Sequence, residues 1–464
     1  MSNKKTASLK RGTSTKTLTL AVASACLVIG AGAAHAVDCP ATISGGQDGC
    51  EVKGSLTVNN GVTVSGANDG LGYDGVAIRV LTNATNITNN GTISGTDGGL
   101  LVDGNITVNA ITNTGTGVIN GGIDVPIARI TTLTNDGSID GGNDTAGIGV
   151  SEGGTISSIV NTGSIGGEEG IGVADTGSTV TSINNSGTIS GTFYGIIAED
   201  GGKITTITNT ATGIIASPTV AIDLTGGSGA TTINNAGTIN GEVRMNNSTT
   251  LNMLNGGKVN GVVSGGGTLA VAAGATATVT SYTQSANSVL RIGADSETSY
   301  GKLNVTGTAD LSASGKINVN AANYAGITDG KTLTSVLTAG SLTAGALITT
   351  DNSLLWRFEA VQNGNDIDLI AHQDASLDAI TTTGGGSSTA QSVAQTLDQI
   401  AASNPSPVMQ DLLDALGTVA TTTPEAVASA VESLAPINSG SLAQVATGNL
   451  QGVNNVVQAR LETA

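Results

Sequence analysis

A nine-residue pattern of apolar and turn residues recurs between about residue 75 and residue 262. It runs apolar, x, Asn, x, Gly, x, apolar, x, Gly, and clear copies begin at Ile87, Leu133 and Ile159. The asparagines at its third position follow one another at a period near 24: Asn89, Asn113, Asn135, Asn161, Asn185, Asn209, Asn235 and Asn255. Self-similarity at a fixed period is typical of a solenoid, in which each repeat buries its apolar face against its neighbours.

Two further apolar segments separate successive asparagines, as at 148–150 and 155–159. Apolar and polar residues alternate there, which predicts strands whose Ile and Val point inward while Thr and Ser face water. Three short strands per repeat predict a right-handed parallel β-helix with coils of about 24 residues. Gly and Asn suit the turns because they adopt left-handed backbone conformations, and stacked Asn side chains would form an amide ladder along the axis.

The pattern changes after Gly267, where alternating strands lack the Asn anchor and most of the aromatic residues lie. A Gly-rich stretch at 384–388 then precedes segments with apolar residues at helical spacing and Pro-initiated starts. We therefore expect these parts: a signal peptide at 1–36, an N-terminal cap at 37–74, a repetitive β-helix at 75–265, a C-terminal β-helix cap at 266–373, a flexible linker at 374–392 and a helical linker at 393–464.

The N-terminus has the pattern of an export signal. A cationic segment precedes an apolar run at 18–34, and small residues follow, which predicts cleavage between Ala36 and Val37. Cleavage leaves two cysteines, Cys39 and Cys50. In an oxidising compartment we expect them to form a disulfide, with free thiols and a metal site as the open alternatives.

Composition excludes some functions. The chain has 68 Gly, only 2% aromatic residues and a net charge of −18, and removing residues 1–36, with five cations and no acid, changes the charge from −18 to −23. An ordinary globular core is hard to build from this composition. The negative charge repels phosphate backbones, so we expect no nucleic-acid partner.

The order of the parts resembles that of type V autotransporters with pertactin-like passengers. Lys302–Leu311 is similar to a strand-and-turn phrase of their C-terminal coils, and the stretch 434–436 with Arg460-Leu461 is similar to the region before their barrel. The resemblance implies export through the periplasm to the outer membrane or cell surface of a Gram-negative bacterium. It also implies an outer-membrane translocator barrel as partner. No barrel strands follow in this sequence, so we expect the barrel in a missing C-terminal part or on a separate chain.

The sequence offers few catalytic residues. His372 is the only histidine after residue 36, so a Ser-His-Asp triad is not expected, and we predict no cofactor and no enzymatic activity. The pairs Glu168-Glu169 and Glu199-Asp200 are consistent with carboxylates of a carbohydrate-active β-helix, although Gly neighbours favour solvated turns. The segment Gly141-Gly-Asn-Asp144 resembles part of a calcium-binding glycine-aspartate repeat, but the motif does not recur.

Phe193-Tyr194 is the one adjacent aromatic pair in the regular coils. It either projects toward a partner or, as we favour, fills a wider turn. These observations favour an adhesin or surface-display protein with a host-cell, matrix or self-association ligand. The alternatives are a carbohydrate-active enzyme that uses Asp or Glu, and a passive structural spacer.

Overall fold

A computed structural model describes residues 37–44, 47–66, 75–321, 326–403 and 405–435. These residues divide into two compact units. One unit holds the strands up to His372, and the other holds the helices together with residues 353–357. The predicted signal peptide, including Ala36, lies outside the described residues, as do residues 436–464 of the predicted helical linker.

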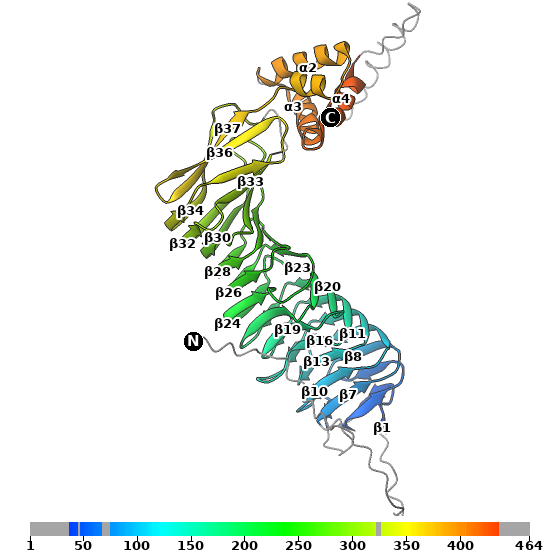
Figure 1. Ribbon diagram of the computed structural model, residues 1–464. Helices are drawn as coiled ribbons and strands as arrows, with labels where there is room; N and C mark the ends of the chain where they lie inside the picture. Colours follow the sequence, from blue (N-terminus) through cyan, green and yellow to red (C-terminus); the bar gives the residue numbers. More distant parts are fainter. Residues whose placement is uncertain (1–36, 45–46, 67–74, 322–325, 404, 436–464) are drawn as a thin grey trace, which may run out of the picture. The chain divides into compact units, whose positions relative to one another are not determined.

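The first unit is a parallel β-solenoid of about 11 turns, with about 24 residues per turn, which confirms the predicted fold class. Each regular coil contributes one strand to a 14-stranded sheet and two strands to a 23-stranded sheet. Figure 1 labels β8 and β11 of the smaller sheet and β10 and β13 of the larger one. The smaller sheet contains β2 (Thr42–Ile43), β5 (Leu56–Val58), β8 (Ala84–Asn89), β11 (Thr107–Asn113), β14 (Arg129–Asn135), β17 (Thr155–Asn161), β20 (Thr179–Asn185), β23 (Lys203–Asn209), β25 (Thr231–Asn235), β27 (Thr249–Met253), β29 (Gly267–Val271), β31 (Ser288–Ala294), β33 (Lys316–Ala321) and β35 (Ile348–Asp351).

The larger sheet covers the other two sides of the coils. It contains β1 (Val37–Asp38), β3 (Gln47–Asp48), β4 (Cys50–Val52), β6 (Thr63–Ser65), β7 (Val76–Val80), β9 (Thr92–Ser94), β10 (Gly98–Val102), β12 (Val118–Asn120), β13 (Ile123–Pro126), β15 (Ser138–Asp140), β16 (Ile148–Ser151), β18 (Ser164–Gly166), β19 (Glu169–Ala174), β21 (Thr188–Ser190), β22 (Tyr194–Glu199), β24 (Ile214–Asp223), β26 (Thr238–Met245), β28 (Lys258–Gly265), β30 (Thr276–Thr283), β32 (Lys302–Leu311), β34 (Thr332–Ala344), β36 (Trp356–Asn363) and β37 (Asp366–Gln373).

Stacked apolar residues form the core of the solenoid. In β17 every inward residue is buried, whereas outward Ser157 is exposed. Ile156 pairs with Val180 of the next coil and Ile159 pairs with Ile183. Because strands alternate with a period of two, this register places one aliphatic side chain above another.

The predicted amide ladder runs through seven coils. From Asn89 to Asn209, each side-chain Nδ2 donates to the Oδ1 of the asparagine one coil later, at 2.8 or 2.9 Å, and the last acceptor is Asn235. The prediction for Asn255 is wrong, because the position in register with Asn235 is Met253 and Asn255 lies exposed in the following turn. Only 18 residues separate Asn235 from Met253, fewer than separate the ladder asparagines before them, so the sequence motif falls two residues late.

The solenoid already includes the predicted N-terminal cap. Strands β4, β5 and β6 pair in parallel with β7, β8 and β9 of the next coil. Cys39 and Cys50 are joined by a disulfide. Val37, the predicted mature N-terminus, is the first residue of β1.

The C-terminal coils differ from the regular ones. Strand β37 pairs antiparallel with β34, in contrast to the parallel pairing of the coils before it. Phe358 of β36 is 1% exposed, within the segment that the sequence predicts as the closing cap. An aromatic side chain is thus buried where the stack of aliphatic coils ends.

The second unit contains α1 (Leu377–Thr383), α2 (Ser388–Ala401), α3 (Pro407–Val419) and α4 (Pro424–Leu434). The expected flexible linker at 374–392 is wrong, because α1 and the start of α2 lie there. Ser387 caps α2, and Gly384 lies so close to the backbone of Pro424 that a Cβ would clash. The glycines therefore permit close packing here. Within the described residues, the helices are too short or too polar to cross a membrane.

Candidate functional site

An open groove lies on one face of the solenoid, over β10, β13, β16, β19 and β22. Its volume is about 280 Å³. Nine carboxylates and no Lys, Arg or His line it: Asp97, Asp124, Asp144, Glu152, Glu168, Glu169, Asp175, Glu199 and Asp200. We call this set the acidic groove. It gathers acids from successive coils that are far apart in sequence.

Small side chains create the hollow. Asp124 of β13 pairs with Gly149 of β16, and Gly149 pairs with Gly172 of β19. This outward position therefore carries no side chain in two successive coils. Ala146 and Ala174 also line the groove. A Cβ at Gly149 would lie 3.3 Å from Oδ1 of Asp124, so a larger residue would fill the space beside this carboxylate.

One wall of the groove is a column of strained turn residues. Glu152, Asp175 and Asp200 occupy equivalent turns of successive coils with φ of 52°, 72° and 49°. The left-handed conformation is uncommon for residues other than Gly, and Asp tolerates it better than most. The backbone N–H of Glu152 donates to Oδ2 of Asp175 at 3.2 Å, which links two of these turns.

Glu169 is the most buried acid of the groove. It begins β19, is in register with Tyr194 of β22, and is 3% exposed. Burial, followed by the negative charges of Glu168 and Glu199, raises the pKa of Glu169 from its ordinary 4.5 to about 7. Within the described chain, no cation forms an ion pair with Glu169. This carboxyl therefore exchanges its proton near neutral pH.

The two acidic pairs noted in the sequence meet in this groove. Glu168-Glu169 and Glu199-Asp200 lie about one coil apart and all four side chains line the same hollow. The prediction of solvated turns is wrong for Glu169, which is buried, but fits exposed Asp200. Sequence reasoning missed Asp124, Glu152 and Asp175. The signal for Glu152 and Asp175 was present, because with Asp200 they recur at the repeat period.

The acids are not arranged as a metal centre. Among the described residues, no three His, Cys, Asp or Glu side chains converge to hold a metal ion. Asp144, from the glycine-rich segment compared with calcium-binding repeats, lines the groove. His372 lies on β37, where its Nε2 is 3.4 Å from Oε2 of Glu359.

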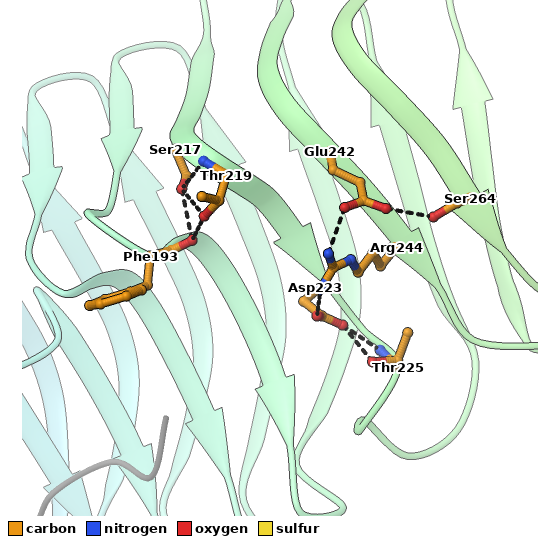
Figure 2. A network of polar contacts seen from close by, with 8 residues as sticks. All are labelled: Phe193, Ser217, Thr219, Asp223, Thr225, Glu242, Arg244 and Ser264. Atoms are coloured by element: carbon orange, nitrogen blue, oxygen red, sulfur yellow. Dashed lines mark hydrogen bonds and ion pairs between the residues drawn. The ribbon is translucent and has the colours of Figure 1, made fainter. Parts of the chain in front are cut away.

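The coils after β22 balance their acids with a cation. Arg244 of β26 lies 2.7 Å from Oε2 of Glu242 and 3.5 Å from Oδ2 of Asp223 (Figure 2). Thr225 donates to Asp223 and Ser264 donates to Glu242, at 2.6 and 2.9 Å. Arg244 thus lies between two acids on this stretch of the sheet, whereas no Lys, Arg or His lines the groove.

Phe193 projects from the turn before β22. Its side chain is 50% exposed, while its carbonyl accepts hydrogen bonds from Ser217 at 2.7 Å and Thr219 at 3.0 Å (Figure 2). The favoured prediction that the aromatic pair fills a wider turn is therefore wrong for Phe193. The two hydroxyls fix the backbone that presents the ring.

Neither a scan against protein-family models nor a search of curated proteins finds a match for this chain.

Proposed function

We propose that this chain is an exported surface protein that binds its partners through the solenoid, as adhesins and display proteins do. The observation that carries the proposal is the acidic groove, in which successive coils present carboxylates around a hollow without a compensating cation among its lining residues. An interaction surface of one charge sign selects and orients oppositely charged partners. The groove is therefore the proposed binding site.

Export is the second part of the proposal. It is supported by the signal pattern of residues 1–36 and by the Cys39–Cys50 disulfide, since disulfides persist in oxidising compartments. A β-solenoid followed by helices is also the order of parts in autotransporter passengers. On this proposal a translocator barrel in the outer membrane holds the protein at the cell surface.

The test is a binding assay with purified protein on cells, on matrix components and on itself. A groove variant, Asp124→Asn with Glu152→Gln and Asp175→Asn, is compared with a control that removes three acids elsewhere, Glu297→Gln with Glu359→Gln and Asp411→Asn. We expect the wild type and the control to bind and the groove variant to lose binding. Binding no stronger than that of an unrelated β-helix would overturn the proposal.

A carbohydrate-active enzyme is the second candidate, and Glu169 is the observation that favours it. Glycoside hydrolysis uses one protonated carboxyl as acid and a second, ionised carboxylate as base or nucleophile. A pKa of about 7 keeps a large fraction of the Glu169 carboxyl protonated near neutral pH. The negative charges of Glu168 and Glu199 contribute to this raised pKa. The roles would fall to Glu169 as acid and to one of these two as carboxylate.

This candidate is tested by release of reducing ends from a panel of polysaccharides. Turnover that disappears in Glu169→Gln and persists in Asp411→Asn would support it. Equal turnover in the wild type and in Glu169→Gln, or none with any polysaccharide, would reject it. Asp411 is exposed on α3, so the control removes one charge far along the sequence from the groove.

A further inference from the structure

We propose that the acidic groove binds alkylammonium groups, which are carried by free polyamines and by lysine side chains, and that Glu169 is the buried carboxylate that receives one of them. This inference rests on the proposed function, because it specifies the ligand chemistry of the same groove. Two independent features support it: the shape of the hollow and the state of Glu169.

The first feature is the build of the groove. Gly149 leaves a space beside Asp124, and Ala146 and Ala174 add small apolar surfaces to the lining. The turn acids Glu152 and Asp175 stand on the same wall in successive coils. An alkylammonium ligand matches this pattern, because its methylene stem contacts apolar surface while its charged head bonds to carboxylates.

The second feature is the isolation of Glu169. Only 3% of this residue is exposed, yet it lines the groove. Its carboxyl bonds to its own backbone N–H, and within the described residues it forms no ion pair. Ionising a buried acid that has no cation beside it costs free energy, and a cation that enters the groove would reduce that cost.

The arrangement favours an ammonium group over a metal ion. A divalent metal needs several oxygens converging at short distances, and no such cluster occurs in the described residues. Here the acids are spread over coils that are about 4.8 Å apart, the usual spacing of neighbouring strands. A linear oligoamine or a lysine-rich segment can place successive charges along such a row.

The charged surroundings of Glu169 determine how pH affects binding. Glu168 precedes it, Glu199 and Tyr194 face it from β22, and Asp144 and Glu152 line the groove from the preceding coil. Beyond Tyr194 lie Asp223 and Arg244, and Arg244 is already paired with Glu242. Every ionisable neighbour inside the groove is therefore acidic or neutral.

Binding is consequently linked to proton release. Near its pKa of about 7, Glu169 is partly protonated, and an ammonium group favours the ionised form. The ligand should therefore displace the proton and bind more tightly as pH rises. If the bound cation lowers the pKa of Glu169 by about two units, affinity rises about tenfold between about pH 6 and pH 8.

The test is titration calorimetry of the purified protein at constant ionic strength. The probes are spermidine as a free polyamine, a hexalysine peptide as a source of lysine side chains, and CaCl₂ as the metal. We expect saturable binding of spermidine, of hexalysine or of both, about tenfold tighter at about pH 8 than at pH 6, with proton release detected in buffers of different ionisation enthalpy. Binding of neither amine, or calcium binding that excludes the amines, would overturn the inference.

Two variants separate a specific groove from general attraction to an acidic protein. Gly149→Val fills the hollow without changing charge and should abolish binding, whereas Glu169→Gln should weaken binding and remove its pH dependence. Asp411→Asn should bind as the wild type does, and circular dichroism checks that each variant folds. If Gly149→Val fails to fold, Asp124→Asn replaces it. Unchanged binding in the groove variants would show surface attraction only.

The two proposals can fail separately. Amine binding in the groove without adhesion to any cell, matrix or self-partner would reject the surface-binding function and leave the ligand assignment standing. Adhesion that depends on the groove but is not displaced by spermidine or hexalysine would reject the ligand assignment alone.

Discussion

The coils from β8 to β25 and those from β27 to β33 place different side chains at the same inward position. In the first group this position is always asparagine, from Asn89 to Asn235. In the second group it is Met253, Val271, Ile292 and Val319. One column of the core is therefore amide in the regular coils and apolar in the later ones.

Buried amides constrain the register of neighbouring coils more strictly than buried aliphatic side chains do. A buried amide needs a donor or acceptor at a fixed place in each neighbouring coil, because an unpaired polar group is costly. An apolar column needs only close contact, so coil lengths can vary. The later coils do vary, because Met253, Val271, Ile292 and Val319 follow one another at steps of 18, 21 and 27 residues. The amide column holds the coils beneath the acidic groove in one register.

Breaking the amide column should have the largest effect. Asn161→Ala leaves the amide of Asn135 without its side-chain acceptor and Oδ1 of Asn185 without its donor, both now at 2.8 Å from Asn161. We expect a loss of about 3 kcal/mol in the free energy of unfolding. Urea denaturation followed by circular dichroism measures it. A loss below about 1 kcal/mol would show that the ladder is not a major source of stability.

The groove should make the stability of the first group depend on pH. The pKa of Glu169 is raised in the folded state, so its contribution to stability is complete below the ordinary value of 4.5 and is lost as pH rises through about 7. Between about pH 5 and pH 8 the wild type should lose on the order of 2 kcal/mol more than Glu169→Gln. Parallel pH profiles of the two proteins in urea would contradict this.

A change in the apolar column should cost less than one in the ladder. Ile292→Val removes one methyl group from a fully buried side chain and leaves no polar group unpaired. We expect a loss of about 1 kcal/mol. Thermal and urea unfolding of Ile292→Val and of Asn161→Ala measures how much stability the apolar column and the asparagine column each contribute. Equal losses would remove the distinction between them.

The smallest effect is expected for an outward asparagine. Asn318 of β33 accepts a hydrogen bond from Arg291 at 3.2 Å and donates to Thr350 at 3.1 Å, and water can reach these groups. Because water replaces lost partners at an exposed site, Asn318→Ala should cost less than about 0.5 kcal/mol. If Asn318→Ala lost as much free energy of unfolding as Asn161→Ala, asparagine would stabilise the coils through its backbone preference for turns and not through its buried side-chain hydrogen bonds.

The repeat was readable from sequence because it consists of local signals at a constant period. Inward Ile, the ladder asparagines and the turn glycines each follow from strand alternation and turn chemistry. Asn255 misled the prediction because only 18 residues separate Asn235 from Met253, so a matching motif falls outside the strand. Motif spacing alone does not reveal a shortened coil.

The groove was harder to predict because it depends on neighbouring coils. Asp124 borders a hollow only because its partner in register is Gly149, and Glu169 is buried only because Tyr194 and other residues of the next coil cover its strand. The local sequence of a turn therefore does not determine whether its acidic side chain is exposed. The Gly-rich segment before α2 was misread for the same reason, since the partner of Gly384 is in α4.

The asparagine column also has a direction. From Asn89 to Asn209, each side-chain Nδ2 donates to the Oδ1 of the following coil. The column therefore begins with the Oδ1 of Asn89, which accepts from the backbone N–H of Gly91, and ends with the amide of Asn235, which donates to the carbonyl of Lys258. Excising the segment from one asparagine to the next would bring a donor and an acceptor together again. The molecule can therefore change its length by whole units, while a deletion of a few residues would misalign every unit beyond it.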